Sequence, residues 1–136
     1  TLEVKTISRE SNRVTISSVF QLESIEMKKH FLKIYRIETI VKSNVDSLGI
    51  LYNEIISMLQ PELINLFQMK CAQDQFSEYL GPIDTPLSYK FLLYEDNLFE
   101  VDQEHFPRIK RMELMFGLTN IKYCVDLSSI EQFKTN

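Results

Sequence analysis

Hydrophobic and polar residues alternate at the start of the chain, in the pattern of a β-strand. In an extended strand, Leu2, Val4 and Thr6 point to one side, and Glu3 and Lys5 point to the other. We therefore predict a strand over residues 2–7. Its apolar side should face the core, and its carboxylate and ammonium should lie next to each other on the exposed side.

Two further strands are predicted downstream. Residues 13–17 alternate again, directly after a cluster of turn-type residues at 8–12. Residues 31–41 are rich in β-branched and aromatic side chains, with apolar residues on both faces, which favours a strand covered on both sides. Ser18 is placed to cap a short helix between these strands. We predict that the three strands belong to one sheet.

The period changes near Asn44, where apolar residues begin to recur at helical spacing. This spacing predicts a helix over residues 47–59, and Pro61 suits the first turn of a second helix over residues 62–80. Two such helices should form a hairpin that packs against the sheet. Their apolar stripes are explained by a core, and they also leave a homodimer surface open.

The rest of the chain is predicted to be mainly strands. A loop at residues 81–86 precedes a strand at 87–94. Glu95, Asp96 and Asn97 should then make a turn, and residues 98–101 should pair back as a hairpin. A short helix over residues 108–116 should end at Gly117, and a last strand should run over residues 119–127.

The composition indicates one globular domain over residues 1–136. Within it we distinguish core strands with a short helix (1–43), a helical hairpin (44–80) and C-terminal strands (87–127). The sequence has no apolar run of membrane-spanning length and no visible signal peptide, so we expect a cytoplasmic protein without a membrane partner. Cys71 and Cys124 lack metal-ligand spacing and are predicted to be free thiols.

The net charge of −4 argues against a broadly basic nucleic-acid-binding protein, although a local basic patch is enough for phosphate contacts. The densest basic cluster, and our candidate for DNA binding, is Arg108, Lys110 and Arg111. A second candidate for phosphate contacts is the cluster of Lys28, Lys29, His30 and Lys33. For both clusters the usual alternative is a basic face that is simply solvated.

Glu3 and Lys5 have the residue types of a site that cuts phosphodiesters. A hard divalent cation such as Mg²⁺ takes carboxylate oxygens as ligands. An ammonium two residues along the strand can hold the attacking water and offset the charge that develops on the phosphate. The same spacing recurs in Glu26-Met27-Lys28, and either pair can instead be an ordinary ion pair on a strand.

The context of the first pair resembles a known family. LEVKT, a turn, RVTISS and then QL are similar to the middle of a family of bacterial PD-(D/E)XK motif proteins in the restriction-endonuclease-like superfamily. Residues 98–102, 105–108 and 121–127 resemble the closing segment of the same family. The resemblance covers nearly the whole chain. It implies a mixed α/β (α+β) fold, in which a restriction-endonuclease-like sheet is flanked by helices.

The resemblance also implies a function. It points to a Mg²⁺-dependent DNA endonuclease, such as those of bacterial restriction or phage-defence systems. Glu3 would then be a metal ligand, Lys5 would orient water or stabilise charge, and Gln21 would help to hold the site. Gln21 is equally well explained as a surface amide. The alternative function is a non-catalytic nuclease-like module that binds DNA or protein.

The sequence departs from the family pattern at one place. In that superfamily an acidic element lies on the strand before the Glu-x-Lys strand, whereas no residue precedes Thr1 here. We therefore expect a fold that is incomplete at its N-terminus and that forms the C-terminal part of a longer nuclease-like protein. Residues 1–136 alone should then cut DNA poorly, because one carboxylate leaves Mg²⁺ with too few ligands.

Overall fold

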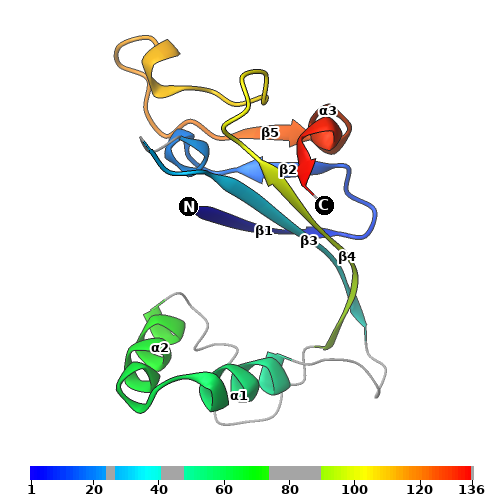
Figure 1. The fold of residues 1–136 in the computed structure, drawn as a ribbon, viewed down its shortest axis with the longest axis vertical. Coiled ribbons are helices and arrows are strands. Elements are labelled where there is room, and N and C mark those ends of the chain that lie inside the picture. Colours follow the sequence, from blue (N-terminus) through cyan, green and yellow to red (C-terminus); the bar gives the residue numbers. More distant parts are fainter. Residues whose placement is uncertain (24–26, 41–47, 74–89, 136) are drawn as a thin grey trace. The chain divides into compact units, whose positions relative to one another are not determined.

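The computed structural model describes residues 1–23, 27–40, 48–73 and 90–135, which belong to two compact units (Figure 1). One unit combines Thr1–Ile37 with Leu93–Asn136, and the other comprises Glu38–Leu92. The described residues form both strands and helices, so the predicted mixed α/β fold class is confirmed. No helix within the described ranges is both long and apolar enough to cross a bilayer.

Four strands form a mixed sheet in the order β1-β3-β4-β6, with bounds of Leu2–Ser8, Phe31–Ile40, Lys90–Glu100 and Lys134–Thr135. β1 runs parallel to β3, with Leu2 opposite Phe31. A parallel pair needs a long crossover connection, and β2 and η1 lie within it. β4 pairs antiparallel with β6, and Figure 1 shows β3 and β4 running in opposite directions.

A separate two-stranded sheet is formed by β2 (Arg13–Ile16) and β5 (Tyr123–Asp126). Its antiparallel register places Arg13 opposite Asp126, and Arg13 Nε donates to Asp126 Oδ1 at 2.8 Å. This hydrogen bond raises the pKa of the Arg13 guanidinium. The prediction that residues 13–17 share a sheet with the first and third strands was therefore wrong. Alternation predicts a strand but does not specify its partner, and this partner lies more than a hundred positions away.

The core of the first unit collects side chains from both sheets. Burial of these side chains supplies the main driving force for folding this unit. The buried side chains form one cluster, which draws on every strand of this unit except β6 and on the segments that join the strands; its members are Ile7, Val14, Ile16, Leu22, Leu32, Ile34, Phe99, Val101, Phe106, Val125 and Ile130. Three partly buried residues pack against this cluster: Tyr123, Leu127 and Phe133.

β1 has its two faces the other way round from the prediction. Leu2 and Val4 are 58% and 50% exposed, whereas Ile7 on the opposite face is buried at 8%. Glu3 and Lys5 share the face of Ile7 and are half-buried. The expectation that Leu2 and Val4 anchor the strand was therefore wrong. Ile7 is the residue that joins the core cluster, and it brings the charged pair inward with it.

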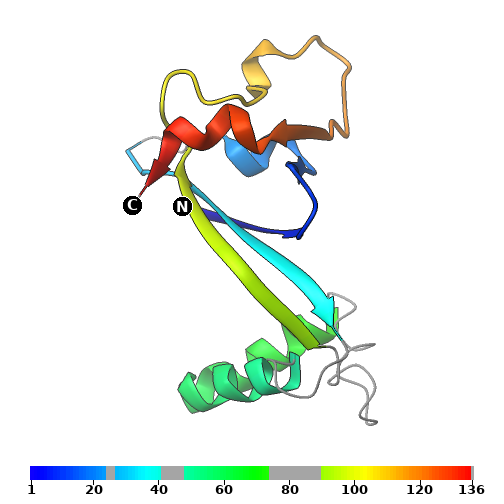
Figure 2. The same ribbon diagram turned by 90° about the vertical axis from the view of Figure 1, so that its right-hand side faces the viewer.

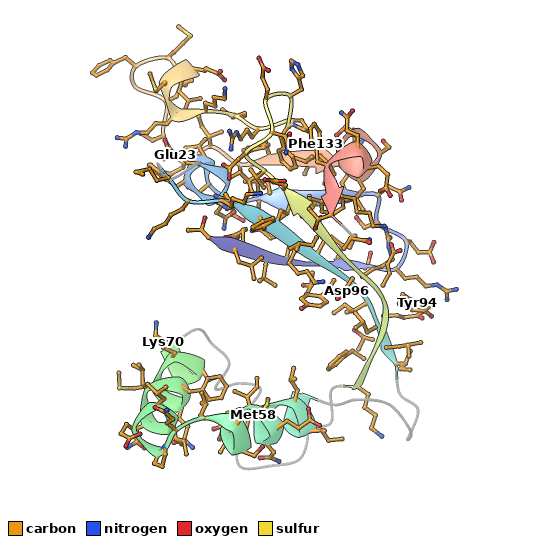
Figure 3. All side chains as sticks on the ribbon, viewed as in Figure 1. Glu23, Met58, Lys70, Tyr94, Asp96 and Phe133 are labelled. Atoms are coloured by element: carbon orange, nitrogen blue, oxygen red, sulfur yellow. The ribbon has the colours of Figure 1, made fainter. Side chains whose placement is uncertain are left out.

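β4 is one continuous strand from Lys90 to Glu100, so the predicted hairpin with a turn at residues 95–97 was wrong. Glu95 lies 2.7 Å from Arg36 Nε, and Asp96 lies 2.6 Å from Lys33 Nζ. Both cations belong to β3, the neighbouring strand in the sheet. The carboxylates thus pair across strands, and this non-local pairing outweighs their local preference for a turn. Asp96 and Tyr94 are labelled on this strand in Figure 3.

The C-terminal part differs from the prediction in length and in kind. The helix expected over residues 108–116 is only the 3-10 turn η3 (Arg111–Glu113), although Gly117 does adopt a left-handed φ of 90°. β5 covers only Tyr123–Asp126 of the predicted last strand. The chain then passes directly into α3 (Leu127–Ile130), followed by η4 (Glu131–Phe133) and β6, as Figure 2 shows.

The described part of the second unit contains two helices, α1 (Leu48–Met58) and α2 (Pro61–Gln73). Pro61 begins α2, where its missing N–H costs no helical hydrogen bond. The Tyr52 and Phe67 rings lie 5.5 Å apart and connect the two helices. Residues 74–80 of the predicted second helix and the predicted loop at 81–86 lie outside the described residues. The packing of this hairpin against the sheet stays a prediction.

Candidate functional site

Glu3, Lys5 and Gln21, the three residues singled out from the sequence, meet in the structure. Glu3 Oε1 lies 3.3 Å from Lys5 Nζ. Lys5 Nζ donates a hydrogen bond of 2.9 Å to Gln21 Oε1. The Ser17 backbone N–H donates to the same amide oxygen at 2.8 Å. Residues 16 positions apart in sequence thus form one continuous polar group.

The position of Gln21 follows from how η1 (Val19–Leu22) begins and packs. The Ser18 side chain caps this 3-10 turn by accepting a hydrogen bond of 3.2 Å from the Phe20 N–H. Val19 and Leu22 are buried and fix the turn on the core. Gln21 lies between these anchors, and its amide oxygen receives the donors from Ser17 and Lys5. The amide is therefore oriented by the fold before any ligand binds.

The charged pair is partly withdrawn from water. The side chains of Glu3 and Lys5 are 24% and 16% exposed. Desolvation makes such a charge costly unless partners compensate it. Among the described residues, Lys5 has two neighbouring acceptors, whereas Glu3 has Lys5 as its only ion-pair partner. The Glu3 carboxylate keeps further acceptor sites for a ligand.

Glu3 and Gln21 line a hollow of about 380 Å³. Phe20, Glu23 and His30 line it too, and none of these three was among the catalytic residues predicted from the sequence. The sequence feature that could have assigned Glu23 to this hollow is its position two residues after Gln21. Figure 3 labels Glu23 beside η1. Neither Glu23 nor His30 forms a triad with a nucleophile in any contact among the described residues.

His30 proves to be a buried residue and not part of a solvated basic face. It is 5% exposed, and its Nδ1 lies 3.1 Å from the Glu23 carbonyl oxygen. Its backbone N–H donates to the Asp102 carboxylate, and its carbonyl oxygen accepts from Val101 N–H at 2.9 Å. These bonds join the start of β3 to the end of β4 and fix one wall of the hollow.

The other members of that second basic cluster are held by carboxylates or lie on a turn. Lys29 pairs with Glu100 at 3.0 Å, and Lys33 pairs with Asp96. Glu26 of the second Glu-x-Lys pattern lies outside the described residues. The residue between its two charged members, Met27, has a left-handed φ of 62°, so that pattern does not lie on an extended strand.

The first basic cluster divides into two roles. Arg108 is 11% exposed in its side chain, donates to the Leu22 carbonyl oxygen at 3.1 Å and lies 3.9 Å from Asp102. Its guanidinium therefore helps to hold the end of η1. Arg111 lies with its guanidinium carbon 5.2 Å from the centre of the Phe20 ring, and Lys110 is exposed. The phosphate-binding role predicted for the three cations stays a prediction.

Glu3 is one carboxylate that a divalent metal ion could take as a ligand. Among the described residues, no group of three or more His, Cys, Asp and Glu side chains is arranged to hold a metal ion. Mg²⁺ commonly takes one or two protein carboxylates and completes its shell with water and substrate phosphates. Glu3 can supply one such carboxylate. The described residues therefore fit a Mg²⁺ site shared with a substrate and do not make a complete protein cage.

The sequence profile of one protein family, described as "Putative PD-(D/E)XK family member, (DUF4420)", matches residues 1–128. The chain belongs to this family. The match covers both strands of the two-stranded sheet and the whole Glu3–Lys5–Gln21 group. Membership confirms the family predicted from the sequence and gives the chain a nuclease-like fold. Neither the curated proteins nor the solved structures contain a match to this chain.

Proposed function

We propose that this chain carries the Glu-Lys part of a Mg²⁺-dependent site that hydrolyses DNA phosphodiesters. The observation that carries the proposal is that Glu3 and Gln21, which line one hollow, both contact the Lys5 ammonium. The match of residues 1–128 to a family described as putative PD-(D/E)XK members supports it. DNA is the proposed partner, in keeping with a nuclease of a restriction or phage-defence system.

Lys5 is the group that acts on water or phosphate. An ammonium has three N–H donors, of which Gln21 accepts one and Glu3 lies in range of another. A third donor can orient the attacking water or stabilise the negative charge that develops on the phosphate. Gln21 fixes the direction of the ammonium, so little reorganisation is needed when substrate arrives.

Glu3 is the proposed metal ligand. A bound Mg²⁺ would supply charge neutralisation at the phosphate oxygens and a more acidic water. The carboxylate lies on the hollow beside the Lys5 ammonium, so one substrate phosphate can be reached by both. The two side chains leave the strand two residues apart, about 6.5–7 Å along it, a span that a phosphodiester and its water can bridge.

The test is cleavage of plasmid and linear DNA by the purified protein, with Mg²⁺ and with the metal chelated. We expect slow cleavage that requires metal, because Glu3 supplies only one carboxylate ligand, and we expect Glu3→Gln to lower its rate by at least about 100-fold, the loss typical of removing one charge-stabilising group. Glu131→Gln is the matched control, because Glu131 also pairs with a lysine, at 3.5 Å, but on the exposed C-terminal segment.

The outcomes separate the two functions considered for this fold. Metal-dependent cleavage that Glu3→Gln abolishes and Glu131→Gln preserves supports the nuclease. DNA binding without any cleavage, unchanged in Glu3→Gln, contradicts it and supports the non-catalytic DNA-binding module. Circular dichroism of each variant confirms that the fold is intact before the activities are compared.

A further inference from the structure

A second hollow adjoins the first, and Phe20 lines both. This second hollow encloses about 370 Å³, which is within the range of ~300–1,000 Å³ that is usual for small-ligand sites. Its lining is mixed. Val19, Leu114 and Ile121 give apolar walls, and the polar side chains are Ser17, Ser18, Thr119 and Asn120. Apolar walls with a few polar groups suit a flat heteroaromatic ring that also forms hydrogen bonds.

Phe20 and Arg111 make a flat cationic surface at this hollow. Phe20 is 58% exposed although it lies between two buried residues of η1. The Arg111 guanidinium carbon stands 5.2 Å from the centre of the Phe20 ring, in the range of a cation–π contact. Arg111 also lines the hollow and is itself exposed. Aromatic rings and guanidinium planes are the surfaces on which unpaired bases stack.

The chain links this surface to the proposed catalytic group. Gln21 follows Phe20 directly, and its amide oxygen holds Lys5, while Ser17 contributes its backbone N–H to Gln21 and also lines the second hollow. A base in this hollow would therefore belong to a nucleotide close to the one whose phosphate reaches Glu3 and Lys5.

We propose that the hollow beside Phe20 and Arg111 binds one unpaired nucleobase of the DNA strand that is cut. The proposal rests on the proposed nuclease function. It identifies the substrate as DNA with a base that is unstacked or flipped out at the cleavage site. A base that leaves the duplex loses its stacking there, and Phe20 and Arg111 offer a replacement surface. Recognition by stacking tolerates any base, so the site fixes the position of the strand more than its sequence.

The experiment uses short oligothymidylates that carry a single 2-aminopurine, moved position by position, with the metal chelated to prevent cleavage. The fluorescence of 2-aminopurine falls when the base stacks. We expect quenching at one position, or two adjacent ones, with the wild-type protein. Phe20→Ala should remove the quenching and weaken binding by about tenfold, the effect of losing one stacked base.

Phe116→Ala is the matched control. Phe116 is a fully exposed aromatic residue on the neighbouring loop that does not line the hollow, so its removal should change affinity by less than about twofold. Phe20→Tyr should keep the quenching. An abasic site at the quenched position should weaken binding to the wild type by the same factor and leave binding to Phe20→Ala unchanged, which tests the contact without relying on one variant's stability.

The results distinguish this inference from the proposed function. If DNA is cut but no position is quenched, or if Phe20→Ala and Phe116→Ala behave alike, the base site is wrong and the nuclease stands. If quenching depends on Phe20 but wild-type protein never cuts DNA with Mg²⁺, the nuclease proposal is wrong and the base site stands. Glu3→Gln should abolish cleavage while keeping the quenching.

Discussion

Two groups of charged residues in the first unit are held in contrasting ways. On β3 and β4 the charges pair across strands: Arg36 with Glu95 at 2.7 Å, and Lys33 with Asp96 at 2.6 Å. On β1 the pair of Glu3 and Lys5 is formed within one strand, at 3.3 Å. The cross-strand pairs tie two segments of chain together, whereas the pair on β1 connects nothing that the strand does not already join.

This difference distinguishes a charge that the fold holds in place from the proposed metal ligand Glu3. Arg36 donates to the carbonyl oxygens of Arg9 and Ser11 at 2.7 and 2.6 Å in addition to Glu95, so its charge is satisfied by the fold. Glu3 is less exposed than Glu95, at 24% against 48% of the side chain, yet among the described residues its only ion-pair partner is Lys5 on the same strand. A carboxylate that is partly buried, although its ion pair joins no second element, is typical of a ligand-binding or catalytic site.

The largest effect on stability is expected at Arg36. Arg36→Ala removes one ion pair and two short charge-assisted hydrogen bonds to the loop after β1, so the free energy of unfolding should fall by about 2–4 kcal/mol. Arg36→Lys should recover only part of this loss, because a single ammonium cannot reproduce the planar fork. Urea denaturation measures both, with Lys134→Ala as the exposed control; equal stability of all three variants would contradict the structural role.

The next effect concerns Lys5 and is kinetic. Lys5→Ala should slow DNA cleavage by about 10- to 100-fold, because the group that orients water and offsets charge is lost. Mg²⁺ binding should be retained or become tighter, since the ammonium 3.3 Å from Glu3 no longer competes for the carboxylate. Lys5→Arg should not restore full activity. Calorimetric titration of Mg²⁺ beside cleavage rates tests both halves; weaker metal binding in Lys5→Ala would be inconsistent with this role.

A smaller effect compares the two glutamates directly. Glu95→Gln should lower the free energy of unfolding by about 0.5–1 kcal/mol, the usual worth of a half-exposed pair, and leave cleavage unchanged. Glu3→Gln should change stability by less than about 0.5 kcal/mol, because Lys5 keeps its bond to Gln21. Thermal unfolding of both variants is the measurement. A larger loss of stability in Glu3→Gln than in Glu95→Gln would make the β1 pair the structural one.

The sequence predicted the elements better than their partners. Alternation located β1 and β2, the richness in β-branched and aromatic residues located β3, and the helical period located α1 and α2, because these are local properties. The turn expected at Glu95 and Asp96 failed because their partners on β3 are about sixty positions away and only the fold brings them near. The same reason explains the wrong sheet for β2.

The candidate site shows a similar limit. The residue types and spacing of Glu3 and Lys5 were visible in the sequence, and Gln21 came from the family resemblance. The direction in which the pair points was predicted wrongly, because Leu2 and Val4 outweigh Ile7 in a simple count of apolar residues. Burial is decided by which side chain joins the core, and Ile7 does so at the end of the strand. His30 carried no pattern that assigns it to the hollow, and Glu23 had only its position two residues after Gln21.

The smallest expected effect is a pH dependence of the free energy of unfolding that arises from Tyr123. This residue belongs to neither of the two groups of charged residues compared above. Burial raises the pKa of this tyrosine above its ordinary value of 10.0, while the Ile109 N–H, which donates to its hydroxyl oxygen at 3.4 Å, and the charge of Arg108 oppose the shift. The folded state therefore holds the phenolic proton more tightly than the unfolded state. Below about pH 10 the tyrosine is protonated in both states, and its contribution to the free energy of unfolding is fully present.

As the pH rises above 10, the unfolded state releases its proton first, so the free energy of unfolding falls and the contribution is lost through the higher folded-state pKa. Tyr123→Phe removes the titrating group and should unfold with a weaker pH dependence above pH 10 than the wild type. At neutral pH the variant lacks the hydroxyl oxygen that accepts from the Ile109 N–H. This loss shifts the free energy of unfolding by an amount that does not depend on pH. Urea denaturation of both proteins between pH 7 and 11 checks this; two curves that stay parallel over the whole range would show that the tyrosine titrates alike in the folded and unfolded chain.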